Sequence, residues 1–482
     1  MRVLLLNPPY FRHYSRSQRS PAVTKSGTLY YPLWLAYAAA VLIHDRHDVL
    51  LLDAPAEDLE FEEVASRVRS FQPHILVVDT STPSIHNDVE VVRKLKEQNP
   101  EAYCVMVGTH VSALPEETLA MSDAVDAVAR REYDFTIRDL TQALAQHHSL
   151  AQVSGLTYRH NGEFLSTPDR PLVEDLDQLP HVIDVFGRFL KSEWYFNPNA
   201  LYPQLTLITS RGCPHQCSFC LFPQTMTGRR YRARSIADVI TELEKVSEVF
   251  PRVRAVFFED DTFVVDWKRT RELCQAILDS KFKLSWSANC RPDVDAETLK
   301  IMKRAGCRTL CVGFESAASS VLNAWKKHST PERMRQFAEE AHRAGIYLHG
   351  CFLVGGVEET SRTMEETLDL AKRLPLDTAQ FYPMMVYPGT EEYRRLHDLG
   401  YLKSQDFSHW LTPEGLHSSV VDTPQISGDD LTRFCDRARR EFYLRPGYLA
   451  KTLVRTASHP KQISRTVKAF RTFAHHLTKS SV

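Results

Sequence analysis

Short apolar runs alternate with helix-length amphipathic segments along the first 150 residues of the chain. The runs lie at residues 3–6, 49–52, 75–78 and 105–107. Continuous apolar runs of this length, separated by helical patterns, are typical of strands that are buried on both faces of a parallel sheet. The pattern predicts an α/β domain at residues 1–150 with a doubly wound, Rossmann-like sheet.

Small, polar or proline residues follow each of these apolar runs. The carboxyl ends of the strands are where such sheets bind ligands, so we expect a cofactor there. No G-x-G-x-x-G motif follows the first run, which argues against NAD. The candidate binding residues are Asn7, Pro8, Thr80, Ser81, Thr82, Gly108, Thr109 and His110.

A second alternation of apolar runs and helical patterns occupies residues 201–400. Its six expected strands lie at residues 205–209, 255–258, 283–288, 309–314, 347–354 and 378–383. Six consecutive βα units predict a partial or full TIM-like barrel, whose chemistry lies at the carboxyl ends of its strands. Residues 151–200 are rich in proline and turn residues, and we interpret them as a linker.

Composition and charge indicate a globular enzyme. The 482 residues include 59 Lys plus Arg, 60 Asp plus Glu and 43% hydrophobic residues, which excludes a disordered or collagen-like chain. The longest near-apolar stretch is interrupted by Pro32 and is too short to span a bilayer, so we expect a cytoplasmic protein. Its 10 cysteines are therefore expected to be reduced, and a close cysteine cluster is read as a metal site.

The C-terminal extension, residues 401–482, ends in a strongly basic segment. One helical face of that segment is apolar, which fits peripheral contact with an anionic inner-membrane surface. The alternatives are a basic helix packed on the acidic remainder of the chain, and nucleic-acid binding, which the lack of interleaved aromatic residues makes unlikely. The apolar face comprises Ile463, Val467, Phe470, Phe473, Ala474 and Leu477, opposite Arg465, Lys468 and Arg471.

Three cysteines follow the first expected barrel strand in a C-x3-C-x2-C arrangement. They are Cys213, Cys217 and Cys220. Thiolates are soft ligands that suit iron–sulfur clusters and zinc, and three thiolates would leave one iron of a [4Fe–4S] cluster open. The alternatives are a zinc site that uses His215 or a distant ligand, and cysteines that are merely buried. The position at a strand's carboxyl end favours a catalytic site.

This cysteine motif resembles the signature of the radical S-adenosylmethionine (SAM) superfamily, and other barrel segments resemble it too. The N-terminal sheet is similar to the cobalamin-binding domain of one large subclass, within which the hopanoid-biosynthesis-associated proteins are the closest match. Residues 357–358 depart from the family's Pro-Gly, and Asn7-Pro8-Pro9 stands where the D-x-H-x-x-G motif would supply a histidine to cobalt. The matching segments are Asp260-Asp261-Thr262-Phe263, Gly313-Phe314-Glu315-Ser316, Gly350 to Thr360 and Tyr387-Pro388-Gly389-Thr390.

The resemblance implies roles for individual residues. The three cysteines would hold the cluster, and cobalamin would bind without a protein histidine below cobalt. The SAM-binding set is Phe219, Glu259, Asn289, Arg291, Glu315 and Gly355. Asp260, Asp261 and Tyr382 are the catalytic candidates near the substrate. Structural alternatives are helix capping for the acidic group, a buried salt bridge from Glu315 to Arg291 or Arg308, and plain packing for the aromatics. A degenerate N-terminal domain that binds nothing is the alternative to a cobalamin site.

The resemblance implies a cobalamin-dependent radical SAM enzyme. A reduced [4Fe–4S] cluster would cleave SAM to a 5′-deoxyadenosyl radical, which abstracts hydrogen from an unactivated carbon of a small or lipid-linked metabolite. Methyl transfer, cyclisation or ring rearrangement would follow, with flavodoxin or ferredoxin as the electron donor. Two other classes stay open: a non-catalytic iron–sulfur or zinc protein whose sheet domain binds a partner, and a tRNA-modifying radical SAM enzyme.

Overall fold

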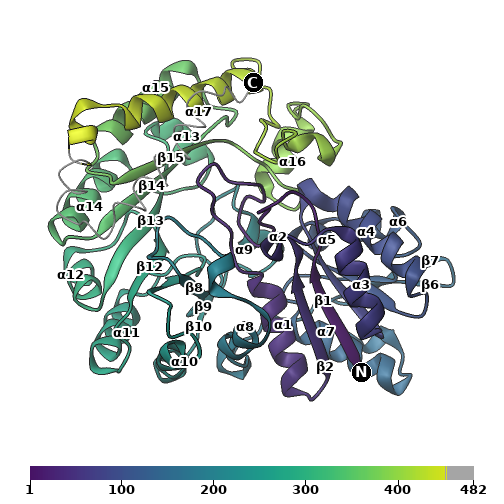
Figure 1. The fold of residues 1–482 in the computed structure, drawn as a ribbon. Helices are drawn as coiled ribbons and strands as arrows, with labels where there is room; N and C mark the ends of the chain where they lie inside the picture. Colours follow the sequence, from purple (N-terminus) through teal and green to yellow (C-terminus); the bar gives the residue numbers. More distant parts are fainter. Residues whose placement is uncertain (451, 453–482) are drawn as a thin grey trace.

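The computed structural model describes residues 1–450 and residue 452. Its two large sheets stand side by side with helices around them (Figure 1), and two short strands form a third, small sheet. The sheet of the N-terminal domain has the strand order β2-β1-β3-β4-β5-β6-β7. The strands from β1 to β5 are parallel, which confirms the predicted doubly wound domain. Its strands are β1 (Arg2–Asn7), β2 (Asp48–Asp53), β3 (Ile75–Thr80), β4 (Tyr103–Gly108), β5 (Ala127–Ala129), β6 (Leu156–His160) and β7 (Glu163–Ser166).

Two strands lie within residues 151–200, where we predicted only connecting structure. Strand β6 pairs antiparallel with β5 and with β7, so the hairpin extends the N-terminal sheet. Asn161 and Gly162 have φ values of 51° and 85°, the left-handed conformations of a two-residue hairpin turn. Strand β7 is short and mostly exposed, so it lacks the apolar run by which we recognised the other strands.

The second sheet has the order β15-β14-β13-β12-β11-β8, and all of its pairs are parallel. This open, six-stranded sheet is the predicted partial barrel, with helices on its outer face (Figure 1). Alternate residues of β13 and β14 are fully buried against these helices, and those between them face the interior of the barrel. The strands are β8 (Gln204–Leu207), β11 (Ala255–Phe258), β12 (Ser285–Cys290), β13 (Cys307–Glu315), β14 (Tyr347–Val354) and β15 (Thr378–Pro383).

Helices surround both sheets. Helix α1 is apolar on nearly every side because it is covered by the N-terminal sheet and by α7 and α8. The helices of the first domain and the linker are α1 (Leu33–His44), α2 (Ala54–Glu57), α3 (Phe61–Phe71), α4 (Ile85–Gln98), α5 (Thr109–Ala113), α6 (Pro115–Ala120), α7 (Asp134–Gln146) and α8 (Val182–Phe189). The later helices are α9 (Leu221–Thr225), α10 (Ile236–Val249), α11 (Trp267–Asp279), α12 (Ala296–Arg304), α13 (Ser319–Ala324), α14 (Pro331–Arg343), α15 (Ser361–Arg373), α16 (Glu391–Asp398) and α17 (Gly428–Tyr443).

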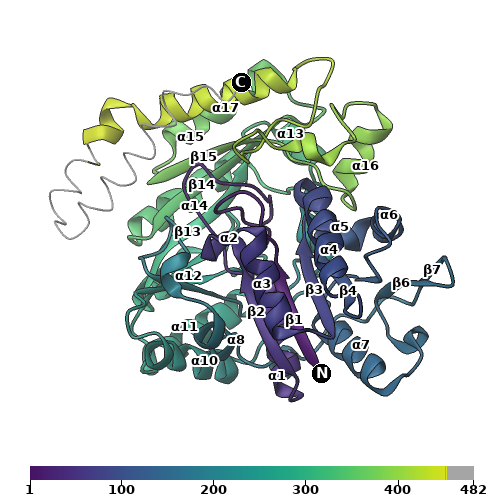
Figure 2. The same ribbon diagram turned by 45° about the vertical axis from the view of Figure 1, so that its right-hand side comes forward.

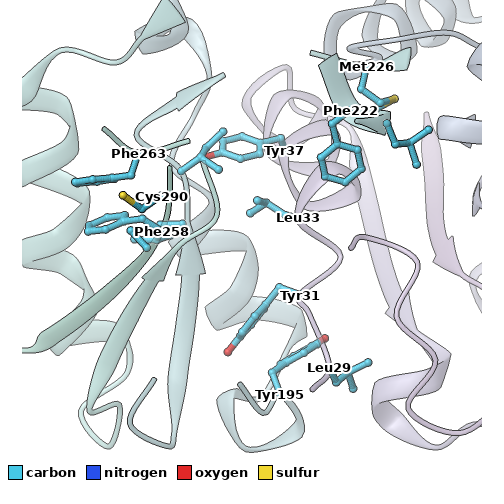
Figure 3. Packing of buried hydrophobic residues seen from close by; sticks show 14 of the residues in the cluster. Leu29, Tyr31, Leu33, Tyr37, Tyr195, Phe222, Met226, Phe258, Phe263 and Cys290 are labelled. Carbon is cyan, nitrogen blue, oxygen red and sulfur yellow. The ribbon is translucent and has the colours of Figure 1, made fainter. Parts of the chain in front are cut away.

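The connection between β1 and α1 passes between the two sheets and over the barrel, and we call residues 8–32 the strap (Figure 2). At its end, the ring of Tyr31 stacks on Tyr195 with 3.7 Å between ring centroids, and the Tyr31 hydroxyl donates a 2.9 Å hydrogen bond to the Gln204 carbonyl. Figure 3 shows these rings in the apolar contact between the domains. The strap therefore belongs to the first domain and is also part of the barrel's wall.

Buried ion pairs also join the N-terminal domain to the barrel. Arg211 Nη1 lies 2.6 Å from Asp134 Oδ2, and Arg232 Nη2 lies 2.7 Å from Glu132 Oε1. All four side chains are almost fully buried. Because a buried charge is costly without a partner, these pairs fix the two domains in one relative position.

The C-terminal extension covers the barrel rim. Helix α17 packs on β15 and α15, as Figure 1 also shows, and a side chain at Gly355 would come within 2.7 Å of Leu431 on α17. The extension also reaches the first domain, because Phe407 lies edge-on against His110. The predicted apolar face at residues 463–477 lies outside the described residues.

Within residues 1–450 and residue 452, no helix is both long enough and apolar enough to cross a membrane.

Replacing Asp134 by Asn tests whether the domain interface depends on buried charge. The variant leaves Arg211 buried without its main counter-charge, so we expect the free energy of unfolding to fall by roughly 3 to 5 kcal/mol. Urea titration measures it. The control is Glu174→Gln, which removes the exposed partner of Arg230 and should cost less than about 1 kcal/mol. Equal losses in both variants would contradict the interpretation.

Candidate functional site

The cysteine loop begins where β8 continues into the short strand β9 (Ser210–Arg211), which pairs with β10 (Arg232–Ala233). Gly212 then turns the chain with φ +84°, and a Cβ at this position would lie 2.1 Å from the Arg230 carbonyl oxygen. Only glycine fits there. The chain therefore turns sharply at Gly212, and the cysteines that follow lie at the carboxyl end of the barrel strand.

The three predicted cysteines all lie on this loop, and the thiols of Cys213 and Cys217 both act electrostatically on that of Cys220. Cys217 is buried, and Cys213 and Cys220 are half-buried. The pKa of the Cys213 thiol is raised to about 11, mainly by burial, with smaller contributions from the nearby Asp261 and Cys217. Within the described residues, no three His, Cys, Asp or Glu side chains surround one metal-ion position. Three nearby thiols fit a [4Fe–4S] cluster, in which each cysteine binds a different iron.

Asp260 and Asp261, which we predicted as catalytic, hold the cysteine loop. Asp260 accepts hydrogen bonds from the Thr209 amide at 2.7 Å and from the hydroxyls of Thr209 and Ser210 at 2.6 and 2.7 Å. Asp261 Oδ2 accepts from the Gly212 amide at 3.0 Å and from the Thr227 hydroxyl at 2.7 Å. Both carboxylates are thus bound to the backbone or hydroxyls around the loop, which makes them positioning residues.

Glu259 is the member of the acidic group that faces the barrel mouth. Its Oε1 accepts a hydrogen bond from Arg19 of the strap, and its Oε2 is buried without a hydrogen-bond partner among the described residues. Asn289, at the neighbouring strand end, donates to the Asp260 carbonyl at 3.3 Å. An unsatisfied buried carboxylate oxygen fits a ligand that brings a positive charge or an N–H donor.

Three other predicted SAM-binding residues lie in or near the cysteine loop and make contacts within the protein. Arg291 Nη1 lies 3.7 Å from Cys217 Sγ, and Arg291 also donates to the Lys327 carbonyl. Glu315 Oε1 pairs with Lys327 Nζ at 2.7 Å, so its salt bridge is to a lysine and not to Arg291 or Arg308. Phe219 stands edge-on to Trp325 with 5.6 Å between ring centroids.

Two further predicted residues differ in their access to the barrel interior. Gly355 has φ +117°, a conformation that residues with side chains rarely adopt, and it packs beneath Leu431 of α17. Tyr382 points into the barrel interior from β15 and is partly exposed, with its ring 6.2 Å from that of His417. Cys311 and Cys351, on β13 and β14, face the same interior.

The predicted cobalamin residues lie at the carboxyl edge of the N-terminal sheet, as expected. Several of them bond to other side chains there: Asn7 to Asp53 at 2.7 Å, Thr80 to Asp88 at 2.8 Å and Ser81 to Tyr14 at 2.9 Å. Gly108 has φ +117° and lets the Thr80 carbonyl approach to 2.3 Å from where a Cβ would be. Pro8 offers its carbonyl to Arg16 at 2.8 Å, and Thr109 begins α5.

The single histidine among these candidates is His110. Its Nδ1 lies 3.1 Å from the Thr82 hydroxyl, and burial lowers the pKa of the imidazole to about 3. At the same edge, the buried hydroxyls of Ser17 and Tyr133 lack hydrogen-bond partners among the described residues. His110 is buried and is expected to be neutral, whereas the hydroxyls of Ser17 and Tyr133 remain available to a ligand. This arrangement fits a cobalamin that is held by hydrogen bonds and packing.

Sequence reasoning missed the strap. Arg16 is fully buried and pairs with Asp88 at 2.5 Å, and Arg19 pairs with Glu259 across the domain interface. Neither residue belongs to a motif or to a strand end. The one available signal was length, because a connection of 25 residues without regular structure is unusual inside a compact α/β domain and is commonly functional.

Comparisons with known proteins agree with this arrangement. The family model described as Radical SAM superfamily matches residues 207–371, and the model described as B12 binding domain matches residues 19–140. An uncharacterized methyltransferase of Pyrococcus horikoshii is 31% identical over 94% of this chain and 95% of its own length. An anaerobic magnesium-protoporphyrin IX monomethyl ester cyclase of Rubrivivax gelatinosus is 26% identical over 98% of this chain and 82% of its own.

A solved structure shares the whole fold. The radical SAM methyltransferase TsrM of Kitasatospora setae, solved with cobalamin and a [4Fe-4S] cluster, superposes with a TM-score of 0.72 at 16% identity. The match covers 92% of this chain and 91% of TsrM. The two-domain architecture is thus common to both proteins.

Asp261→Ala tests the support of the cysteine loop. It removes the acceptor for the Gly212 amide and the Thr227 hydroxyl, so we expect iron affinity to fall about 10- to 100-fold while the protein stays folded. Iron retained against a competing chelator after anaerobic reconstitution gives the measurement. Asp279→Ala, an exposed site at the end of α11, should retain iron like the unchanged protein. Full iron retention in Asp261→Ala would exclude this role.

Proposed function

Because this chain belongs to the radical SAM superfamily and carries a B12-binding domain, we propose that it is a methyltransferase that alkylates an unactivated carbon of a small or lipid-linked metabolite. The observation that carries the proposal is the pairing of Arg211 with Asp134, which joins the cysteine loop directly to the N-terminal domain. The cluster site and the cobalamin edge are thereby parts of one rigid assembly.

The [4Fe–4S] cluster, SAM and cobalamin supply the redox and methyl-transfer chemistry when bound. The chain's own residues orient these groups and exclude water. Cys213, Cys217 and Cys220 hold the cluster, and Asp260 and Asp261 keep their loop in place. The hydroxyls at the edge of the N-terminal sheet, among them those of Ser17 and Tyr133, would hold cobalamin through hydrogen bonds.

The barrel interior receives the substrate in this proposal. Tyr382 and the strap's Tyr30 are partly exposed, and neither hydroxyl has a hydrogen-bond partner among the described residues. Burial raises the pKa of both phenols well above their usual value, so each remains a neutral donor at physiological pH. Two such donors suit an oxygen-bearing metabolite better than an aliphatic one.

Cyclisation is a second candidate outcome. The Rubrivivax relative, which spans nearly this whole chain, is named as a cyclase. Both outcomes begin with the same SAM cleavage, and they separate at the fate of the substrate carbon. Methylation adds one carbon from SAM to the product, and cyclisation adds none.

Two partners complete the proposal. A flavodoxin or ferredoxin supplies the single electron that reduces the cluster. The C-terminal segment, residues 451–482, carries seven Lys plus Arg and no acidic residue, which supports peripheral binding to an anionic membrane and access to a lipid-linked substrate.

SAM cleavage by anaerobically reconstituted protein tests the proposed function. We expect 5′-deoxyadenosine to form with a chemical reductant, and to be absent in Cys217→Ala. Cys274→Ala, a buried cysteine of α11, serves as the control and should retain the activity. Bound cobalamin and a labelled methyl group recovered in the product would distinguish methylation from cyclisation. A colourless, zinc-loaded protein that forms no deoxyadenosine would overturn the proposal.

Liposome co-sedimentation of the full chain and of a chain ending at residue 450 tests the membrane contact. The basic segment should contribute about 1 kcal/mol of binding per Lys or Arg near an anionic surface. Truncation should therefore abolish binding to anionic vesicles and leave binding to neutral vesicles unchanged. Equal binding by both chains would contradict it.

A further inference from the structure

The strap contacts every part of the described molecule. Tyr14 and Arg16 bond to the edge of the N-terminal sheet, and Arg19 bonds to the barrel. Ser20 Oγ lies 2.9 Å from the Tyr387 hydroxyl and 2.9 Å from His417 Nε2, which belongs to the C-terminal extension. With these anchors on both sides, the position of Arg19 is set by the folded protein.

Arg19 places a guanidinium at the barrel mouth beside the cysteine loop. It donates to Glu259 Oε1 and, at 2.9 Å, to the Asp260 carbonyl, and its carbon atom Cζ lies 5.5 Å from the centre of the Phe222 ring. Its side chain is 29% exposed, whereas that of Glu259 is 6% exposed. A guanidinium has five N–H donors, so Arg19 keeps donors for a further ligand.

Opposite charges therefore stand side by side at the mouth. Glu259 Oε2 is buried and lacks a hydrogen-bond partner among the described residues, so it can accept from an ammonium or amine. The guanidinium beside it can donate to a carboxylate, a pairing that Arg favours. This combination is complementary to an α-amino acid, which carries an amino group and a carboxylate on one carbon.

We propose that Arg19 and Glu259 together bind the methionine moiety of SAM, Arg19 through the carboxylate and Glu259 through the amino group. The proposal rests on the proposed function and adds Arg19, a residue of the N-terminal domain, to the SAM site. SAM thus contacts both domains.

Equilibrium binding of SAM and of decarboxylated SAM to the reconstituted protein tests the assignment. Arg19→Gln should raise the Kd for SAM about 10- to 100-fold, because a charge-assisted hydrogen bond is lost. The Kd for decarboxylated SAM, which lacks the carboxylate, should change less than about threefold. Comparing the two ligands cancels any effect of the substitution on Glu259 itself.

Two control variants separate this effect from a loosened strap. Lys25→Gln removes the strap's pair with Asp436, and Ser20→Ala removes its bonds to Tyr387 and His417. Both should lower the affinities for the two ligands equally or leave them unchanged. Arg19→Lys should recover part of the SAM affinity.

Two results would overturn the assignment. Tighter binding of both ligands by Arg19→Gln would make Arg19 a plug that SAM displaces, and equal losses for both ligands would make its role purely structural. If the unchanged protein bound no SAM at all, the proposed function itself would fail, and this outcome is distinct from the other two.

Discussion

Two buried carboxylates of the N-terminal domain, Glu132 and Asp134, set the geometry on which the rest of the site depends. They bind Arg232 and Arg211, which flank the cysteine loop in β10 and β9. The guanidinium of Arg211 also lies over the rings of Trp34 and Tyr37, 4.7 and 4.9 Å from their centres. Each of the four buried charges would cost a large amount of free energy if its partner of opposite charge were removed. The cysteine loop therefore cannot shift independently of the first domain.

Hydrogen bonds also fix the cysteine loop to the barrel. Asp260 accepts hydrogen bonds from Thr209, and Asp261 accepts them from Gly212 and Thr227. The carboxylates at this strand end therefore fix the position of the cysteine loop. Its neighbour Glu259 has the opposite character, because one of its oxygens is buried without a hydrogen-bond partner among the described residues. Of the three consecutive acids, Asp260 and Asp261 therefore hold the cysteine loop, whereas Glu259 keeps one oxygen without a partner among the described residues.

Sequence reasoning recovered what depends on local pattern. Both sheets follow from the alternation of apolar runs, and so does the position of Cys213, Cys217 and Cys220 on a loop after the first barrel strand. It failed where long-range contacts decide. The role of Asp260 depends on hydroxyls that are 50 residues away, the partner of Glu315 is Lys327, and β7 is too short and polar to register as a strand. The strap carries no motif because its residues act by reaching three separate parts of the fold.

The strap also bears on how such two-domain proteins exchange parts. Its residues are encoded with the N-terminal domain, yet Tyr31 and Arg19 complete the barrel by bonding to Gln204 and Glu259. A recombination event that replaced the first domain would also replace the strap. The residues that line the barrel mouth would then change although the sequence of the barrel itself had not. The domains are separate in the order of the chain, but they are inherited as one functional unit.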